Sequence, residues 1–535
     1  MKLKRLAAIA AVAAISLSLA ACGSGGKSEQ GSVQEKKDTS VVNIGATSTM
    51  DTPNPLVMSA TWVNLYGVGM EFLPLVSQND NLQFENMLAD SITTDDNLTY
   101  TVKLDPKAKW SDGKPVTASD LEFTIMRMAS PKVMNSVVKV TDIMGTDDQT
   151  GWLKEGAKSM DGLKVVDDHT LKITFKHPVN KTSFMNGYAQ YILTVPKHVL
   201  ENVPEKDLAS YDWFNHPTVV SGPYIMKKHD ANHFASFEAN KNYWKGAPKI
   251  QYCNIKRVDS SQLLSGMKSG EIDIIAPLLG AIPQSDYDSF KNLKGAKTND
   301  GLAITTETLF INGQNIPDAK VRQALLYALD RKTIAAGLSG EKAKLMDGFL
   351  VPDGPYYDGK KPVEYNPEKA KELLKEAGWK GDKQLSLYVD SGNGALVNAA
   401  TLAQNYWKAV GINVSVVKEN LDTLISKGGS KDVDMLGVQY TYPAVDSSWD
   451  IDWTLDKWCH LYPDNVKKHL DTIWNSNDEK VLKQNYNDID AWVQKDVPVI
   501  ALYAHGPLGV IRDSMENAKA STYGFTNNIQ EWSFK

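Results

Sequence analysis

Residues 110–123 read WSDGKPVTASDLEF and combine a turn with the start of a helix. The Ser-Asp-Gly triplet favours a tight turn, because Asp and Gly tolerate backbone conformations that other residues avoid. Thr117 is followed three residues later by Asp120, which is the spacing of a capping box. Apolar residues recur at helical spacing from Leu121 onward. The stretch therefore predicts a turn that leads into a capped, amphipathic helix.

The residues just before this stretch alternate in polarity. Tyr100, Val102 and Leu104 are separated by Thr and Lys, so that one face is apolar and the other polar. This period of two is typical of a half-buried strand. The local order is therefore strand, turn and helix.

The sequence of residues 110–123 closely resembles a signature of the family 5 extracytoplasmic solute-binding proteins. These proteins are the oligopeptide-, dipeptide- and nickel-binding receptors of ABC importers. Further stretches resemble other motifs of this family and follow in the family's order. They are DDHTLKITF at 167–175, SGPY at 221–224, NKNYW at 240–244, SGEIDI at 269–274, DAKVRQAL at 318–325 and YNPEKAKELLKEAG at 365–378. The resemblance extends from about residue 41 to the C-terminus.

The resemblance implies an α/β, periplasmic-binding-protein-like fold, in which two α/β lobes are joined by a hinge and an extra domain is inserted in the first lobe. Strand and helix patterns that alternate between residues 385 and 439 agree with a mainly parallel sheet in the second half of the chain. We expect lobe I to comprise residues 41–75, 187–300 and 500–535, the inserted domain II residues 76–186, and lobe III residues 301–499.

The N-terminus has the pattern of a secretory signal, with basic residues followed by a mostly apolar run that is short for a membrane span. Residues 1–21 are therefore predicted to be a signal peptide. Leu19-Ala20-Ala21-Cys22 resembles the lipobox of bacterial lipoproteins, which implies lipidation of Cys22 and anchoring to the extracytoplasmic face of the cell membrane. The alternative is an ordinary secreted protein with an incidental cysteine. Residues 22–40 are rich in Gly, Ser, Lys and Glu, and predict a flexible linker after the lipidated N-terminus.

Composition excludes several classes of protein. The net charge of −6 argues against nucleic acid as a partner. The sequence also has no basic stripe interleaved with aromatic residues. Apart from Cys22 the chain has Cys253 and Cys459, which either form a disulfide or remain buried free thiols. The sequence contains no serine-hydrolase elbow, zinc-protease motif, phosphate-binding loop or dinucleotide fingerprint. We therefore expect a binding protein without a cofactor or metal, and not an enzyme.

The predicted ligand site lies beyond the carboxyl ends of the strands in the second half, where open α/β sheets bind ligands. The loop after residue 439 is rich in aromatic residues, and the segment 498–506 resembles the strand by which the chain returns to the first lobe. His505 in that segment either contacts ligand or satisfies a backbone group. Our candidate ligand-binding residues are Trp62, Gly437, Val438, Gln439, Tyr440, Thr441, Tyr442, Asp446, Trp449, Tyr503 and His505.

One position departs from the family's pattern. In oligopeptide receptors an aspartate after this strand pairs with the α-ammonium group of the ligand, and by register Thr441 occupies that position here. A buried ammonium group without a counter-charge is costly. Either Asp446 supplies the charge from a shifted loop, or a free peptide N-terminus is not required. A third possibility is that Asp446 only caps the segment that follows it.

The resemblance implies a monomeric receptor that captures oligopeptides by hinge closure and delivers them to the permease subunits of an ABC transporter, whose ATPase subunits are separate chains. Alternatives within the same fold are receptors for a nickel chelate, haem, an oligosaccharide or a signalling peptide. An alternative from another class is a surface lipoprotein hydrolase, which would turn over its substrate instead of returning it unchanged.

Overall fold

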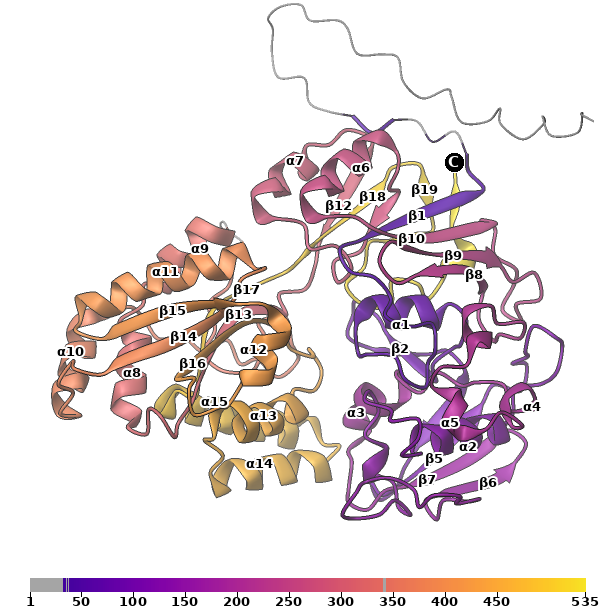
Figure 1. Ribbon diagram of the computed structural model, residues 1–535, viewed down its shortest axis with the longest axis horizontal. Helices are drawn as coiled ribbons and strands as arrows, with labels where there is room; N and C mark the ends of the chain where they lie inside the picture. The colour runs from indigo at the N-terminus through magenta and orange to yellow at the C-terminus, as the bar shows by residue number, and fades with distance from the viewer. Residues whose placement is uncertain (1–31, 35, 37, 340–342) are drawn as a thin grey trace, which may run out of the picture.

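The structure of the chain is a computed structural model that describes residues 32–34, 36, 38–339 and 343–535. The predicted signal peptide and the lipidation site Cys22 lie outside these residues. Figure 1 shows two bodies beside one another. The segment from β13 to β17 forms one body, and the first part of the chain together with the segment after β17 forms the other. Three sheets organise these bodies.

The first sheet has seven strands in the order β12-β18-β11-β1-β10-β9-β8, and we call it and its helices lobe I. β1 runs parallel to β10 and β11, whereas the remaining neighbours are antiparallel. The strands are β1 (Val41–Ala46), β8 (Tyr224–Asp230), β9 (Phe234–Ala239), β10 (Tyr252–Arg257), β11 (Ile274–Ile275), β12 (Ala296–Asp300) and β18 (Leu508–Arg512).

The second sheet contains the strand that precedes residues 110–123, and we call its region domain II. It has the order β4-β5-β7-β6, with β4 (Ala89–Thr93), β5 (Thr99–Leu104), β6 (Leu163–Asp167) and β7 (Thr170–Thr174). The apolar side chains of β5 are buried, as the alternation predicts. The capping box is also confirmed, because the backbone N–H of Thr117 donates to Asp120 at the start of α2 (Ala118–Met128).

The third sheet has the order β15-β14-β16-β13-β17 and defines lobe III. Its strands are β13 (Thr305–Ile311), β14 (Gln384–Asp390), β15 (Asn413–Glu419), β16 (Met435–Thr441) and β17 (Val499–His505). β13 is antiparallel to both of its neighbours, and the pairs of β14 with β15 and β16 are parallel. Four strands therefore run in one direction and β13 alone runs in the other. Two of the four adjacent pairs are antiparallel because β13 lies between β16 and β17, so the sheet is mixed and the predicted mainly parallel sheet is confirmed only for β14, β15 and β16.

The position of β17 corrects one expected boundary. Lobe I was expected to resume at residue 500, but β17 pairs along its length with β13 in lobe III. The chain returns to lobe I only at β18, which pairs with β11 and β12. An apolar strand can extend either sheet equally well, so its pattern alone does not assign it to a lobe.

The helices cover both faces of the third sheet (Figure 1). The cores of the two faces contain side chains from different helices. One face carries α8 (Ala319–Tyr327), α9 (Arg331–Ser339), α10 (Pro367–Glu376) and α11 (Gly394–Ala409), and the other carries α12 (Leu421–Lys427), α13 (Ser448–Thr454), α14 (Asp464–Asn475) and α15 (Glu479–Asp496). Elsewhere the helices are α1 (Trp62–Gly69), α3 (Lys181–Phe184), α4 (Lys197–Leu200), α5 (Glu205–Leu208), α6 (Leu263–Ser269) and α7 (Tyr287–Lys291). Two short hairpins pair β2 (Val76–Gln78) with β3 (Phe84–Asn86) and β19 (Met515–Glu516) with β20 (Ser533–Phe534).

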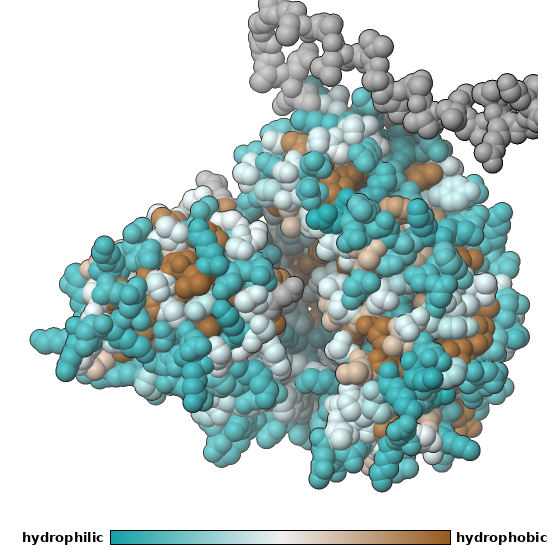
Figure 2. All heavy atoms as spheres, in the orientation of Figure 1, coloured by the Kyte–Doolittle hydropathy of each residue, from teal (hydrophilic) through white to brown (hydrophobic). Residues whose placement is uncertain are grey.

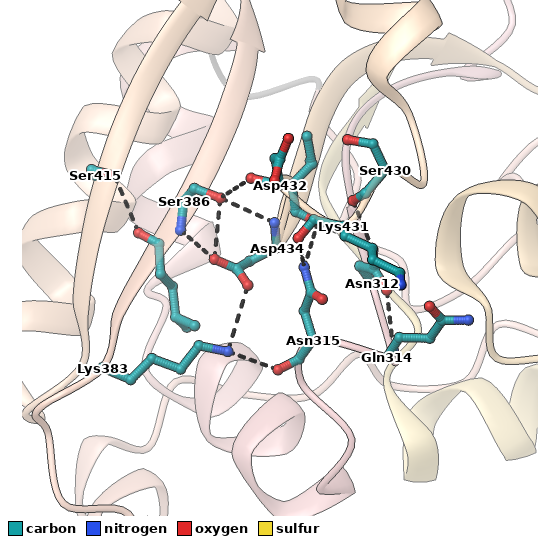
Figure 3. A network of polar contacts seen from close by, with 12 residues as sticks. Asn312, Gln314, Asn315, Lys383, Ser386, Ser415, Ser430, Lys431, Asp432 and Asp434 are labelled. Carbon is teal, nitrogen blue, oxygen red and sulfur yellow. Dashed lines mark hydrogen bonds and ion pairs between the residues drawn. The ribbon is translucent and has the colours of Figure 1, made fainter.

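A polar network fixes the third sheet at the amino ends of β14 and β16. Figure 3 shows Lys383, Ser386 and Asp434 pointing toward one another. The Asp434 carboxylate accepts from the Ser386 backbone N–H at 2.8 Å and from its hydroxyl at 3.1 Å, and Lys383 Nζ lies 3.6 Å from the same carboxylate. These contacts hold the strands in register, and the strands then present their carboxyl ends at the opposite edge of the sheet.

The chain passes between lobes I and III twice, after β12 and after β17. Gly301 and Gly506 lie at these passages, and the Gly301 N–H donates to the Pro507 carbonyl at 2.9 Å. A Cβ atom on Gly506 would lie 1.9 Å from the Gly301 carbonyl oxygen. The passages are therefore in direct backbone contact, which requires glycine at residue 506.

The described part of the expected linker lies against lobe I rather than standing free. The Val33 N–H donates to the Lys294 carbonyl at 2.8 Å, and Lys36 Nζ lies 2.7 Å from the buried Asp273 carboxylate. Arg512 Nε lies 2.8 Å from the other oxygen of Asp273. The ion pair with Asp273 therefore holds Lys36 against lobe I, although the composition of residues 22–40 is that of a linker.

Candidate ligand-binding site

The candidate site lies at the edge of the third sheet where β14, β16 and β17 end and β13 begins. The two passages to lobe I start from this edge, so it faces the other body of the molecule. Figure 2 shows the surface hollowed between the two bodies. The predicted position of the site, beyond the carboxyl ends of the strands, corresponds to this edge and stays a prediction.

Aromatic side chains from all three parts of the chain gather around this edge. Trp62 of α1 lies 5.5 Å from the Tyr523 ring and packs against the core of lobe III as well as that of lobe I. Trp449 of α13 meets Tyr188 edge to face at 5.5 Å, and Lys139 Nζ lies 3.7 Å from the centre of the Trp449 ring. Trp449 thus contacts residues of the opposite body, as a ligand-enclosing side chain would.

Asp446 is only 4% exposed and its carboxylate already has three donors. Oδ1 accepts from the Tyr486 hydroxyl at 2.6 Å and from the Ser448 N–H at 2.9 Å. Oδ2 accepts from the Ser183 hydroxyl of domain II at 2.5 Å. The contact with Ser448 matches the capping interpretation, whereas the bond to Ser183 joins domain II to lobe III.

Further polar contacts between domain II and lobe III surround the bond between Ser183 and Asp446. The Asn180 amide donates to the Ile473 carbonyl at 2.8 Å. The Asn97 amide donates to the Asn475 carbonyl at 3.1 Å and accepts from the Asn477 amide at 2.6 Å. The two bodies are therefore in hydrogen-bonded contact at this place.

Asp450 is a second carboxylate at the site and lies in the first turn of α13, after Asp446. The Tyr440 hydroxyl donates to Asp450 Oδ1 at 2.6 Å. The pKa of Asp450 is raised from 3.8 to about 6, mainly by burial, with the Tyr440 hydrogen bond opposing the shift and the nearby Asp446 contributing to it. Asp450 therefore titrates closer to neutral pH than an ordinary aspartate.

A third polar group, which we call the Glu307 cluster, consists of Glu307, Asn393, Gln439, Tyr503 and His505. Glu307 is 1% exposed, and its carboxylate accepts from the Gln439 amide at 2.9 Å and from the Asn393 amide at 3.1 Å. His505 Nε2 lies 3.8 Å from Glu307 Oε1. The Tyr503 hydroxyl and both His505 ring nitrogens are buried and have no hydrogen-bond partner among the residues that the structure describes. His505 therefore does not satisfy a backbone group.

The remaining predicted residues differ in their access to the site. Gly437, Val438 and Tyr442 are buried within the sheet and its cores. Thr441 is half-buried, and its hydroxyl lies 3.1 Å from that of Thr305 on β13. Gln439 is exposed and Tyr440 half-buried, so these side chains remain open to a ligand.

Sequence reasoning missed Glu307, Asp450 and Ser183. Glu307 carried a signal, because it lies in the otherwise uncharged strand TTETLFI, and a charge in a buried strand is rare. Asp450 and Ser183 carried none, since each is an ordinary polar residue at the start of a short helix. Their partners are remote in the sequence.

The described cysteines form no disulfide, so the alternative of buried free thiols holds. Cys253 and Cys459 are buried free thiols, and burial raises the pKa of both. No described helix is long and apolar enough to cross a membrane. Within the described ranges, no three His, Cys, Asp or Glu side chains are grouped to hold a metal ion.

Two α/β lobes, joined by paired chain passages and enclosing a polar and aromatic site, define the class of two-lobed solute-binding proteins. A family model confirms this class over most of the chain. The model is that of the middle region of the bacterial extracellular solute-binding proteins, family 5, and it matches residues 83–464. The chain belongs to this family of binding proteins.

The oligopeptide-binding protein AppA of Bacillus subtilis (strain 168) is 26% identical over 492 residues, which cover 86% of this chain and 85% of AppA. The solved structure of B. subtilis AppA with a nonapeptide has a TM-score of 0.74 at 23% identity, covering 92% of this chain and 99% of AppA. The structure of NikZ from Campylobacter jejuni with Ni(L-His) also has a TM-score of 0.74, at 24% identity, covering 93% of this chain and 100% of NikZ. The structural matches confirm the periplasmic-binding-protein-like fold.

Proposed function

We propose that this chain is an extracytoplasmic receptor for oligopeptides, which it captures by hinge closure and delivers to the permease subunits of an ABC transporter with separate ATPase subunits. The observation that carries the proposal is the bond between Ser183 and Asp446, because it joins domain II to lobe III across the candidate site. A ligand enclosed between the lobes favours a closed arrangement by its own differential contacts.

Peptides suit this site for a physical reason. An extended peptide hydrogen-bonds through its backbone, which gives affinity that does not depend on side-chain identity. The ends of β16 and β13 supply strand backbone next to half-buried aromatic side chains such as Trp62 and Tyr440. AppA, which is similar over most of both chains, is named for oligopeptide binding, and this supports the same ligand class here.

We also propose that a lipid on Cys22 anchors the receptor to the extracytoplasmic face of the cell membrane and that it acts as a monomer. Replacement Cys22→Ser tests the anchor, because it should move the protein from the membrane fraction to the soluble fraction. Retention of the Cys22→Ser protein in membranes would contradict a lipid anchor at this residue.

Native mass spectrometry tests the ligand class. A chain that begins at Ser28 retains every residue that the structure describes. We expect this chain to carry co-purified peptides of mixed sequence, which denaturation releases for sequencing. A single nickel chelate, haem or oligosaccharide would instead identify a dedicated receptor of the same fold. Turnover of an added peptide would contradict a receptor and favour a hydrolase.

A further inference from the structure

Glu307 is a buried carboxylate without a close cationic partner among the described residues. Its 1% exposed side chain accepts hydrogen bonds only from the neutral amides of Asn393 and Gln439. Buried charges in proteins are usually paired with an opposite charge, because desolvation of a single ion is costly. Among the described residues, the Glu307 carboxylate therefore has no positively charged group bound to it.

His505 does not supply this compensation in the structure. Its Nε2 lies 3.8 Å from Glu307 Oε1, and neither ring nitrogen has a hydrogen-bond partner. An imidazolium paired with a carboxylate normally forms a short, charge-assisted hydrogen bond. The ring stands beside the carboxylate without binding it.

The Tyr503 hydroxyl is a second, independent sign of a missing group. Tyr503 is 0% exposed and its hydroxyl has no partner within the described part of the chain, although buried polar atoms are nearly always hydrogen-bonded. Tyr503 and Glu307 are direct neighbours across β17 and β13. The unpartnered hydroxyl and the uncompensated carboxylate therefore belong to one place in the site.

The Glu307 cluster is also accessible from the candidate site. Gln439 is exposed, and Asn393 and His505 are half-buried, so the buried carboxylate lies directly behind side chains that reach the surface. Gln439 lies two residues before Thr441 in β16, so both side chains are on the same face of the sheet, at the edge that faces lobe I. A group on a bound ligand can thus reach Glu307.

We infer that the Glu307 cluster binds a cationic group of the ligand, an ammonium or a guanidinium, with the Glu307 carboxylate as its counter-charge. This inference rests on the proposed peptide receptor and adds a residue that determines specificity. The cation would donate to Glu307, and the Tyr503 hydroxyl and a His505 nitrogen would contact the same part of the ligand. The source of the cation is either the amino terminus or a basic side chain.

The binding experiment uses a chymotryptic digest of serum albumin as the probe, added to the chain from Ser28 after its own ligands are removed by unfolding and refolding. Three forms of the digest are compared: untreated, acetylated at the amino termini only, and acetylated at all amines. The wild-type chain should retain at least tenfold more peptide from the untreated digest than from the fully acetylated digest. The form acetylated only at the termini separates the amino terminus from lysine as the source.

Glu307→Gln should remove most of this preference, because the amide keeps the shape of the side chain and loses its charge. Glu419→Gln is the matched control, since Glu419 ends β15 at the far edge of the same sheet and pairs with Lys427. It should keep the wild-type preference. The same preference in Glu307→Gln as in the wild type would overturn the inference.

A ligand-free measurement separates this inference from the proposed function. If Glu307 awaits a cation, Glu307→Gln should leave the Tm of the ligand-free chain unchanged or raise it, because it removes an uncompensated buried charge. If Glu307 only supports Asn393 and Gln439, the Tm should fall, and the inference is then wrong. A wild-type chain that retains no peptide from any digest contradicts the peptide receptor, whereas the Tm comparison still decides the role of Glu307.

Discussion

The hydroxyl of Ser183 donates to the carboxylate of Asp446 at 2.5 Å, although 263 residues separate the two in the sequence. Ser183 belongs to α3 next to the sheet of domain II, and Asp446 follows β16 of lobe III. The bond therefore exists only when the two bodies meet. It connects the position of the lobes to a residue in the candidate site.

Ser183→Ala should shift the chain toward an open arrangement of the lobes. The Asp446 carboxylate would keep Tyr486 and Ser448 as donors and lose the donor from the opposite body. A hydrogen bond to a charged group contributes about 1.5–3 kcal/mol, so the closed state should be destabilised by about that amount. Spin labels at Lys158→Cys and Lys408→Cys, both exposed sites, report the distance between the bodies.

The matched control for Ser183→Ala is Ser426→Ala, which removes a hydroxyl that donates to Thr423 within α12. It should leave the distance distribution as in the wild type. The role of Ser183 would be contradicted if both variants gave the same distribution. In the chain that begins at Ser28 the native cysteines are Cys253 and Cys459, which are buried and should not take up the label.

Asp446→Asn should weaken the binding of a peptide and of its N-acetylated form by the same factor. The Asp446 carboxylate already has three protein donors, so its contribution to binding comes through closure rather than through contact with an ammonium group. Calorimetric titration of both forms of one co-purified peptide measures the two factors. Selective weakening of the free peptide would instead identify Asp446 as the anchor of the amino group.

Asp450 should make the stability of the chain depend on pH. Its pKa is raised from 3.8 to about 6 in the folded state, so between these values the folded chain holds a proton that the unfolded chain releases. Lowering the pH through this window therefore stabilises the folded state, and the stabilisation is lost as pH rises through 6. For this partly exposed residue the change should be about 1–3 kcal/mol.

Asp450→Asn should accordingly raise the free energy of unfolding at pH 7.5 and have little effect at pH 4. Urea unfolding at the two pH values measures the difference. Asp382→Asn is the control, because Asp382 is exposed and should change stability at neither pH. An equal effect of Asp450→Asn at both pH values would show that Asp450 acts through packing and not through its charge.

Gly506→Ala should disrupt the passages between the lobes. Its Cβ would lie 1.9 Å from the Gly301 carbonyl oxygen, and backbone must move to relieve this contact. Overpacking of this kind costs about 1–3 kcal/mol, which should appear as a lower Tm and weaker peptide binding. Gly337→Ala in α9 has no atom within 4 Å of its new Cβ and should be neutral or stabilising. Wild-type Tm in Gly506→Ala would contradict a tight passage.

Local patterns predicted much of the fold because they depend on neighbours in the sequence. The capping box at Thr117, the alternation of β5 and the helix between Asn366 and Gly378 all form as predicted. Each is fixed by backbone hydrogen bonds over a few residues, together with a side chain that caps or breaks the element. The resemblance of several such motifs in order was sufficient to identify the family.

The sequence by itself therefore determined the family and the α/β fold class, and it predicts the edge of the sheet where a ligand binds. Tertiary structure alone decided that β17 completes lobe III, that Ser183 binds Asp446 and that Glu307 lies buried between Asn393 and Gln439. The physical reason is that a carboxylate's role depends on which donors surround it. Those donors come from strands and helices that are distant in the sequence and meet only when the sheets pack.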